Sequence, residues 1–310
     1  MPAVRSKHSK HYFSPKPRLA DIIFGCDEKL RLEDLFNPDL VAVKTLKSDR
    51  YFVSANVRFE DLPENMQAKL ADRFTRATCD ALTSLYLAGN KYVTPEHIAY
   101  AMNGYSNKRR KSTPEFLAQI EESVEVLRHT WCRIDATKEA QAKGYNFTET
   151  KFDGALIPSD GLEVVDMNGK RTKAYEIFKE PILYRYAKQK GQVLTVDINL
   201  LALPEKINMT RENIILRNYL LAQIDWMNHS NRSRTMTYET IFKEIGKQDA
   251  VRVEKQRIRQ RIRLFLDNWV NLGYIKGYEE EPKTNGLAKE KITITLHEDH
   301  YILHSNYENN

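Results

Sequence analysis

Apolar residues recur at steps of three and four along the first half of the chain, which is the period of an amphipathic helix. The longest such stripe predicts one helix of about 25 residues, and it consists of Met66, Leu70, Phe74, Ala77, Ala81 and Leu85. A short helix is expected next, with Thr94 as N-cap, Pro95 at its first position and Gly104 at its end.

A third helix begins at the capping box of residues 112–115 and carries a stripe of its own. That stripe is made of Leu117, Ile120, Val124 and Leu127. Alternating and β-branched runs predict strands at 51–59 and 132–135 and a β-meander at 152–178, with turns at 159–161 and 168–169.

The second half repeats this order, with a helix at 210–228, a short capped helix from Thr237 to Gly246, and a third helix from 251 that ends before Gly273. Thr94 aligns with Thr237 at an offset of 143 residues, and Ile120 aligns with Ile262 at an offset of 142. Two segments that agree within one residue indicate an internal duplication, although the identities are few and a chance match is the alternative.

A helix, a short helix and a third helix followed by a strand and a hairpin are typical of a winged-helix domain. We therefore predict an α+β fold of two tandem winged-helix domains related by internal duplication, with a β-hairpin-rich insertion in the first. The expected parts are a flexible basic tail at 1–20, a first winged-helix domain with an N-terminal extension and the insertion at 21–200, and a second, DNA-binding winged-helix domain at 201–305.

Charge adds a class of partner to this fold. The 48 Lys and Arg exceed the 42 Asp and Glu, and the net charge of +6 favours a polyanion such as nucleic acid. The cysteines, Cys26, Cys79 and Cys132, are widely spaced, so neither a disulfide framework nor a thiolate zinc site is expected. Without a long apolar run or a signal peptide, the sequence predicts a soluble, cytoplasmic protein with no membrane partner.

The third helix of the second half carries the candidate DNA-reading surface. Residues 251–263 hold six Lys or Arg and one Glu, and helical projection sets Gln256 and Gln260 opposite the apolar stripe. Arg and Gln make bidentate contacts to guanine and adenine edges. The candidate DNA-binding residues here are Arg252, Lys255, Gln256, Arg257, Arg259, Gln260 and Arg263, together with Thr237 and Tyr238 of the short helix.

The alternative is an ordinary solvated helix face. Against it, Lys255, Arg259 and Arg263 stack like charge at steps of four, which destabilises an isolated helix unless an anion relieves it. The third helix of the first half is acidic instead and is a poor candidate for a groove; its acidic residues are Glu115, Glu121, Glu122 and Glu125.

Two further groups of cations complete the candidate interface. The loop before the acidic helix fits a phosphate contact and a solvated linker equally well, and it holds Lys108, Arg109, Arg110 and Lys111. The wing hairpin of the second half would present Lys283, Lys289 and Lys291 to phosphates.

Motifs of other protein classes are missing or weak. No phosphate-binding glycine loop occurs, so a nucleotide cofactor is not expected. The histidines of the segment 297–304 have a metal-like spacing, but a solvated tail explains them better, and we expect no metal, no cofactor and no catalytic activity.

Tandem winged-helix domains, the second more basic and the first followed by a β-rich insertion, resemble the replication initiators of theta-replicating plasmids, the Rep-type initiator proteins. The resemblance covers roughly residues 50–300 in element order, without a diagnostic motif. It implies binding of double-stranded DNA repeats at an origin, with most base contacts from Gln256, Arg259, Gln260 and Arg263.

The resemblance also implies homodimers through the first domain and contacts with host replication proteins. The third helix of the first copy is acidic, which is a departure from the family pattern and argues against two equal DNA-reading modules. A winged-helix transcriptional regulator is the alternative function, and a DNA-processing relaxase or recombinase is a less favoured one.

Overall fold

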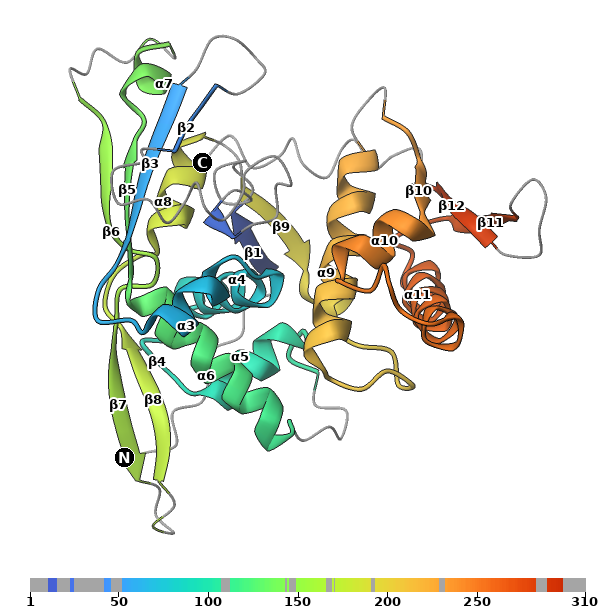
Figure 1. Cartoon of the computed structure of the whole chain (residues 1–310), viewed down its shortest axis with the longest axis horizontal. Helices are drawn as coiled ribbons and strands as arrows, with labels where there is room; N and C mark the ends of the chain where they lie inside the picture. The colour runs from blue at the N-terminus through green and yellow to red at the C-terminus, as the bar shows by residue number, and fades with distance from the viewer. Residues whose placement is uncertain are drawn as a thin grey trace. The chain divides into compact units, whose positions relative to one another are not determined.

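The computed structural model describes residues 11–15, 23–24, 42–45, 52–106, 112–142, 144, 149–165, 169, 171–190, 193–228, 232–282 and 289–297. The chain divides into two compact units, Met1–Ile198 and Asn199–Asn310 (Figure 1). Both units combine helices with small antiparallel sheets, so the predicted α+β class is confirmed.

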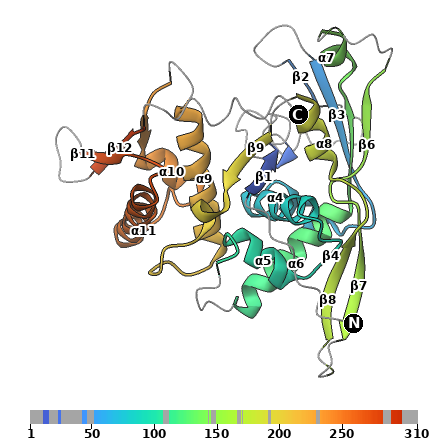
Figure 2. The ribbon, with the colours of Figure 1, turned by 180° about the vertical axis from the view of Figure 1, so that it is seen from behind.

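In the first unit, three helices pack against one another around a buried core: α4 (Arg73–Leu87), α5 (Pro95–Met102) and α6 (Pro114–Arg128) (Figure 2). Leu82, Ile98 and Ile120 of these helices are fully buried. Side-chain oxygens of Thr94 and Thr113 cap α5 and α6, as the sequence predicts for Thr94.

The prediction of one helix along the stripe from Met66 to Leu85 is wrong. The stripe is divided among α3 (Glu64–Gln67), a 3-10 turn η1 (Ala68–Leu70) and α4. Asp72 interrupts the helix because its side chain accepts a hydrogen bond from the Phe74 backbone N–H at 3.2 Å and starts α4 anew.

One sheet of the first unit has the antiparallel order β2-β3-β5-β6, formed by β2 (Ala42–Thr45), β3 (Phe52–Phe59), β5 (Thr130–Asp135) and β6 (Lys151–Ala155). Helix α7 (Thr137–Ala142) lies in the connection between β5 and β6. The strands expected at 51–59 and 132–135 are confirmed as β3 and β5.

A second sheet has the order β4-β8-β7, from β4 (Tyr92–Val93), β7 (Ser159–Val165) and β8 (Arg171–Ile177). The predicted meander is therefore wrong, because β6 pairs with β5 in the other sheet. The turn predicted at 159–161 lies within β7, and the chain instead passes between sheets through Leu156 and Ile157, both fully buried. The other turn was predicted at 168–169. Asn168 lies outside the described residues, and Val165 of β7 pairs with Arg171 of β8 on either side of this turn.

A two-stranded sheet joins the beginning and the end of the first unit. Strand β1 (His11–Pro15) pairs antiparallel with β9 (Val193–Asp197), which follows helix α8 (Ile182–Lys190). The flexible tail predicted for 1–20 is thus wrong for His11–Pro15, because backbone pairing with β9 fixes these residues. Residues 1–10 and 16–20 lie outside the described residues.

The second unit contains α9 (Arg211–Met227), α10 (Tyr238–Glu244) and α11 (Arg252–Asn271), which confirm the three helices predicted there. Its sheet has the order β10-β12-β11, from β10 (Thr235–Thr237), β11 (Gly277–Pro282) and β12 (Lys289–Thr295). The short 3-10 turn η2 (Ile198–Leu201) spans the boundary between the units.

The two units share one order of elements. In the first it is α4, β4, α5, α6, β7, β8, and in the second it is α9, β10, α10, α11, β11, β12. In both units the short strand, β4 or β10, pairs with the second strand of the hairpin that follows it, β8 or β12. The first unit has three additional elements, β5, α7 and β6, between α6 and the hairpin β7–β8.

Candidate nucleic-acid interface

Helix α11 is anchored in the core of the second unit by one face. The side chains of Ile258, Ile262, Phe265, Leu266 and Trp269 are all fully buried, as the helical projection predicts. The Trp269 indole Nε1 also donates a hydrogen bond to the Leu200 carbonyl at 3.2 Å. The anchored face fixes which other α11 side chains point to solvent.

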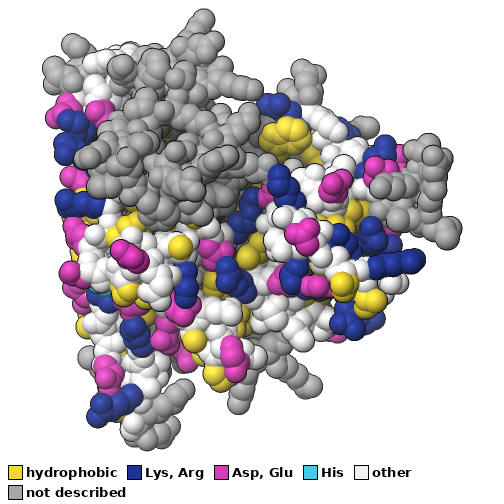
Figure 3. Space-filling view, viewed as in Figure 1, with side chains coloured by type: hydrophobic (Ala, Val, Ile, Leu, Met, Phe, Trp, Pro, Cys, Tyr) yellow, Lys and Arg dark blue, Asp and Glu magenta, His cyan; other side chains and the backbone are white. Residues whose placement is uncertain are grey.

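The opposite face of α11 carries four exposed side chains at steps of three and four. We call this set the outer stripe, and it consists of Val253, Gln256, Arg257 and Gln260. Among the described residues, no side-chain hydrogen bond or ion pair engages Gln256, Arg257 or Gln260, and Arg252 is exposed beside them. Lys and Arg side chains crowd the surface where α11 lies, with hydrophobic side chains between them (Figure 3).

A cationic flank of α11 rests on two aromatic rings of α10. Tyr238 and Phe242 are stacked with ring centroids 6.0 Å apart. The Arg259 guanidinium lies 5.0 Å from the Tyr238 centroid and 5.5 Å from that of Phe242, and Lys255 Nζ lies 5.6 Å from Phe242. Cation–π contacts of this kind hold long side chains in place without neutralising their charge.

The C-terminal part of this flank is bonded to the hairpin β11–β12. Arg263 donates two hydrogen bonds to the Glu280 carboxylate of β11, from Nε to Oε1 and from Nη2 to Oε2, each 2.9 Å long. The Tyr238 hydroxyl donates to the same carboxylate. Glu280 raises the pKa of Arg263, and burial together with Glu280 raises the pKa of Tyr238, so both remain protonated donors.

The other flank of α11 contacts α9. Arg261 Nη1 donates to Asn213 Oδ1 at 2.7 Å, and its Nη2 forms an ion pair with Glu212. Lys247, in the turn before α11, lies 2.6 Å from Glu254 Oε1. Arg261 and Lys247 therefore stabilise the unit, and the unengaged positive charge concentrates near Arg252 and Arg257.

The remaining predicted site residues are distributed as follows. Thr237 is the N-cap of α10, and its Oγ1 accepts from the Thr240 backbone N–H at 3.1 Å. Tyr238 is only 2% exposed, so its prediction as a DNA contact is corrected to a support for Arg259 and Glu280. Lys291 forms a 2.7 Å ion pair with Glu281, and Lys289 begins β12. Lys283 and the loop residues Lys108, Arg109, Arg110 and Lys111 lie outside the described residues.

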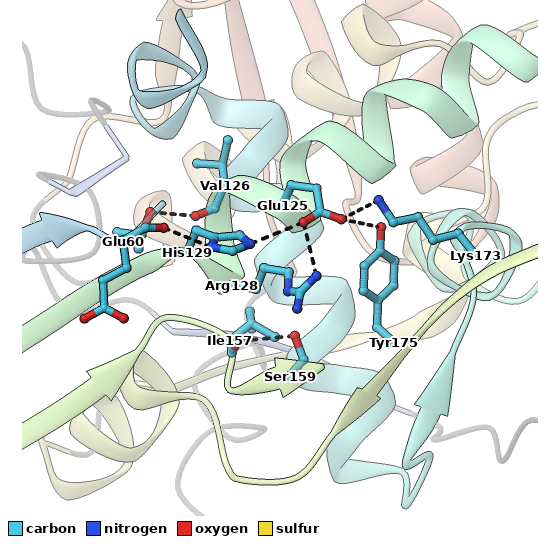
Figure 4. A network of polar contacts seen from close by, with 10 residues as sticks. Glu60, Glu125, Val126, Arg128, His129, Ile157, Ser159, Lys173 and Tyr175 are labelled. Carbon is cyan, nitrogen blue, oxygen red and sulfur yellow. Dashed lines mark hydrogen bonds and ion pairs between the residues drawn. The ribbon is translucent and has the colours of Figure 1, made fainter. Parts of the chain in front are cut away.

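The matching helix of the first unit has the opposite charge arrangement (Figure 4). Glu125 of α6 forms ion pairs with Arg128 on its own helix and with Lys173 of β8. Burial opposes ionisation of Glu125, but the hydrogen bond and charge of Lys173 outweigh it and lower the pKa of the carboxyl group. Here the helix supplies the anion and the strand the cation, whereas α11 supplies the cation and β11 the anion.

Three residues of the candidate interface were not predicted from the sequence. Glu280 and Phe242 position cations of α11, and nothing local in the sequence marks them because their partners lie in other elements. Val253 belongs to the outer stripe, and its spacing of three, four and seven residues from Gln256, Arg257 and Gln260 was the available signal.

Metal-binding clusters and membrane-spanning helices are both absent from the described residues. No group of three or more His, Cys, Asp or Glu in that part of the chain could hold a metal ion. None of its helices is long and apolar enough to span a bilayer. The histidine-rich segment 297–304 is described only at its first residue, the exposed His297.

No family model and no curated protein matches this sequence. Two crystal structures of RctB domains 2 and 3 are similar to the chain. One matches at 11% identity and a TM-score of 0.43 over 82% of this chain and 90% of that chain. A selenomethionine derivative matches at 12% identity and a TM-score of 0.39 over 85% and 96% of the two chains. Likeness at this level supports no conclusion about function.

Proposed function

We propose that the protein binds double-stranded DNA in a sequence-specific manner and that α11 lies in the major groove. The observation that carries the proposal is the outer stripe of α11. Its amide and guanidinium groups have no hydrogen-bond or ion-pair partner in the described part of the chain, and they lie on the face opposite the buried anchor. Such groups match the donor and acceptor pattern of base edges, and neighbouring cations suit phosphates.

We further propose that each unit contains a winged helix and that the two arose by duplication. In support, both units have the same element order and the same pairing of the short strand with the last strand. Thr94 and Thr237 cap the equivalent short helices, and Ile120 and Ile262 are fully buried in the equivalent third helices. In this proposal β11–β12 is the wing beside α11.

At the level of the cell, we propose initiation of replication of a plasmid or related mobile element, without a catalytic step by this chain. This part rests on the resemblance to Rep-type initiators, as do homodimers through the first unit and contacts with host replication proteins. A winged-helix transcriptional regulator is the second candidate. Direct repeats one or two helical turns apart beside the gene favour the initiator, whereas a promoter palindrome favours the regulator.

Footprinting on DNA that flanks the gene tests the proposal. Wild-type protein should protect discrete sites, and the Gln256→Ala/Arg257→Ala/Gln260→Ala variant should lose that protection while keeping weak binding to any duplex. Lys276→Ala is the matched control, because Lys276 is an exposed cation beyond the C-terminal end of α11. Equal protection by all three proteins would overturn the assignment of α11.

A salt titration separates base contacts from phosphate contacts. Arg252→Ala should lower the slope of log affinity against log salt by about 1, with little change in preferred sequence. Metal-dependent nicking, or a covalent protein–DNA adduct, would instead place the protein among relaxases or recombinases and contradict the non-catalytic proposal.

A further inference from the structure

The start of α11 differs from the starts of four other helices. Thr residues cap α5, α6, α9 and α10 through their side chains, whereas α11 begins after Val251 without a side-chain cap. Val251 and Val253 are 69% and 59% exposed. The N-cap and the first turn of the candidate DNA-reading helix thus each present one β-branched apolar side chain to solvent.

Neither helix formation nor packing accounts for Val253. A β-branched residue is a weaker helix former than the straight-chain residues that usually occupy exposed positions, and an exposed Val buries little apolar surface. The position also lies on the outer stripe, one turn before Gln256 and Arg257 and opposite the anchor made by Ile258 and Ile262. Its side chain therefore belongs to the same surface as the unengaged polar groups.

The surroundings of Val253 define the partner that it suits. Arg252, Arg257 and the stacked Arg259 make this end of the helix strongly cationic, which favours a polyanion over an apolar protein surface. On the major-groove edge of DNA the apolar group is the C5 methyl of thymine, and small apolar side chains make contact with it.

We propose that Val253 is a specificity-determining residue that contacts the C5 methyl of a thymine beside the bases read by Gln256 and Arg257. This inference rests on the proposed DNA binding and adds the chemistry of one position in the target site. The polar residues of the stripe read hydrogen-bonding groups, and Val253 distinguishes thymine from uracil and unmethylated cytosine by contact with the methyl group.

The test uses the full chain and the duplex protected in footprinting, with each thymine replaced in turn by deoxyuridine, which removes only the methyl group. We expect one position per site at which replacement weakens wild-type binding about fourfold, the equivalent of roughly 0.8 kcal/mol for one buried methyl group. Val253→Ala should bind the thymine and deoxyuridine duplexes equally at that position.

Val251→Ala is the matched control, because Val251 is also exposed but lies outside the outer stripe; this variant should keep the fourfold difference. Val253→Thr, which retains one γ-methyl group, should keep part of it. Sequence-specific binding that is indifferent to every deoxyuridine, or a difference that persists in Val253→Ala, overturns the inference and leaves the proposed function standing. Wild-type protein that protects no site overturns both.

Discussion

Glu280 links α10, α11 and the hairpin β11–β12 through one carboxylate. It accepts two hydrogen bonds from Arg263 and one from the Tyr238 hydroxyl, and its own side chain is 11% exposed. A charged hydrogen bond of this kind contributes about 1.5–3 kcal/mol, and the partial exposure of Arg263 favours the lower end of that range.

We therefore expect Glu280→Gln to lower the free energy of unfolding by about 1–2 kcal/mol, because the guanidinium loses its charged acceptor. Urea denaturation followed by tryptophan fluorescence measures the change. Glu279→Gln removes the same charge from the exposed neighbouring position of β11 and should stay within about 0.5 kcal/mol of wild type. Equal losses in both variants would contradict the role given to Glu280.

Glu125 provides a prediction with a pH dependence. Its folded-state pKa is lowered, so the stability that it contributes is present above the unfolded-state pKa of about 4.3 and is lost as pH falls through the folded value. Glu125→Gln should lower the free energy of unfolding by about 1–3 kcal/mol at pH 7. The difference from wild type should shrink below about pH 4, where wild-type Glu125 also becomes neutral.

Denaturation at a series of pH values measures this difference. Glu122→Gln serves as the comparison, since its ion pair with Lys69 joins side chains that are 50% and 43% exposed. An exposed pair contributes about 0–1 kcal/mol, so this variant should show a small and nearly constant effect. A pH-independent loss in Glu125→Gln would rule out the carboxylate charge as its source.

At the scale of elements, the spacing of apolar residues predicted the helices whose ends are marked by capping residues or glycines. Apolar spacing predicts α5, α9, α10 and α11. Thr caps mark the starts of α5, α9 and α10, and glycines follow the ends of α5, α10 and α11. The break at Asp72 was invisible to that period because Leu70 and Phe74 face the same core from different elements.

Gly161 shows a second reason for error. Glycine in a polar sequence favoured a turn, but Gly161 lies inside β7 and approaches Arg128 so closely that an added Cβ would lie 2.7 Å from the Nη1 atom. Glycine at this position leaves room for the Arg128 side chain, a contact between residues far apart in sequence that no local sequence pattern indicates. The partner of Arg263 was hidden in the same way, because Glu280 lies 17 residues away in a strand.

The end of α11 depends on backbone conformation at Gly273. This residue has φ +71°, and an added Cβ would meet no atom within 4 Å, so a substitution acts through the backbone alone. We expect Gly273→Ala to lower the free energy of unfolding by about 1 kcal/mol. Gly277→Ala, with equal space and no positive φ, should change it by less than about 0.5 kcal/mol in the same denaturation experiment.

At the scale of the whole molecule, each unit has its own buried core. That of the second unit centres on Trp269, which packs against Phe265 and Tyr274 with centroid distances of 5.8 and 6.2 Å. All three residues belong to Asn199–Asn310, so a fragment with these bounds should unfold in one cooperative transition.

In that fragment Trp269→Ala should lower the free energy of unfolding by about 3–5 kcal/mol, because the substitution leaves a cavity in the core. Trp226→Ala removes the same side chain from a position that is 41% exposed, and it should cost less than about 1 kcal/mol. Calorimetry of the fragment and the two variants measures both values. Similar costs for the two tryptophans would mean that the core is not organised around Trp269.

The pairing of β1 with β9 has a consequence for synthesis of the chain. His11 lies opposite Asp197, so this sheet joins residues 186 positions apart and forms only after residue 197 has left the ribosome. At about 5–20 residues per second, β1 waits on the order of 10–40 s for its partner. From its own synthesis until the sheet forms, α4, which β1 contacts in the finished unit, lacks the cover of the completed sheet. We therefore expect chaperone contacts on the nascent chain to concentrate there.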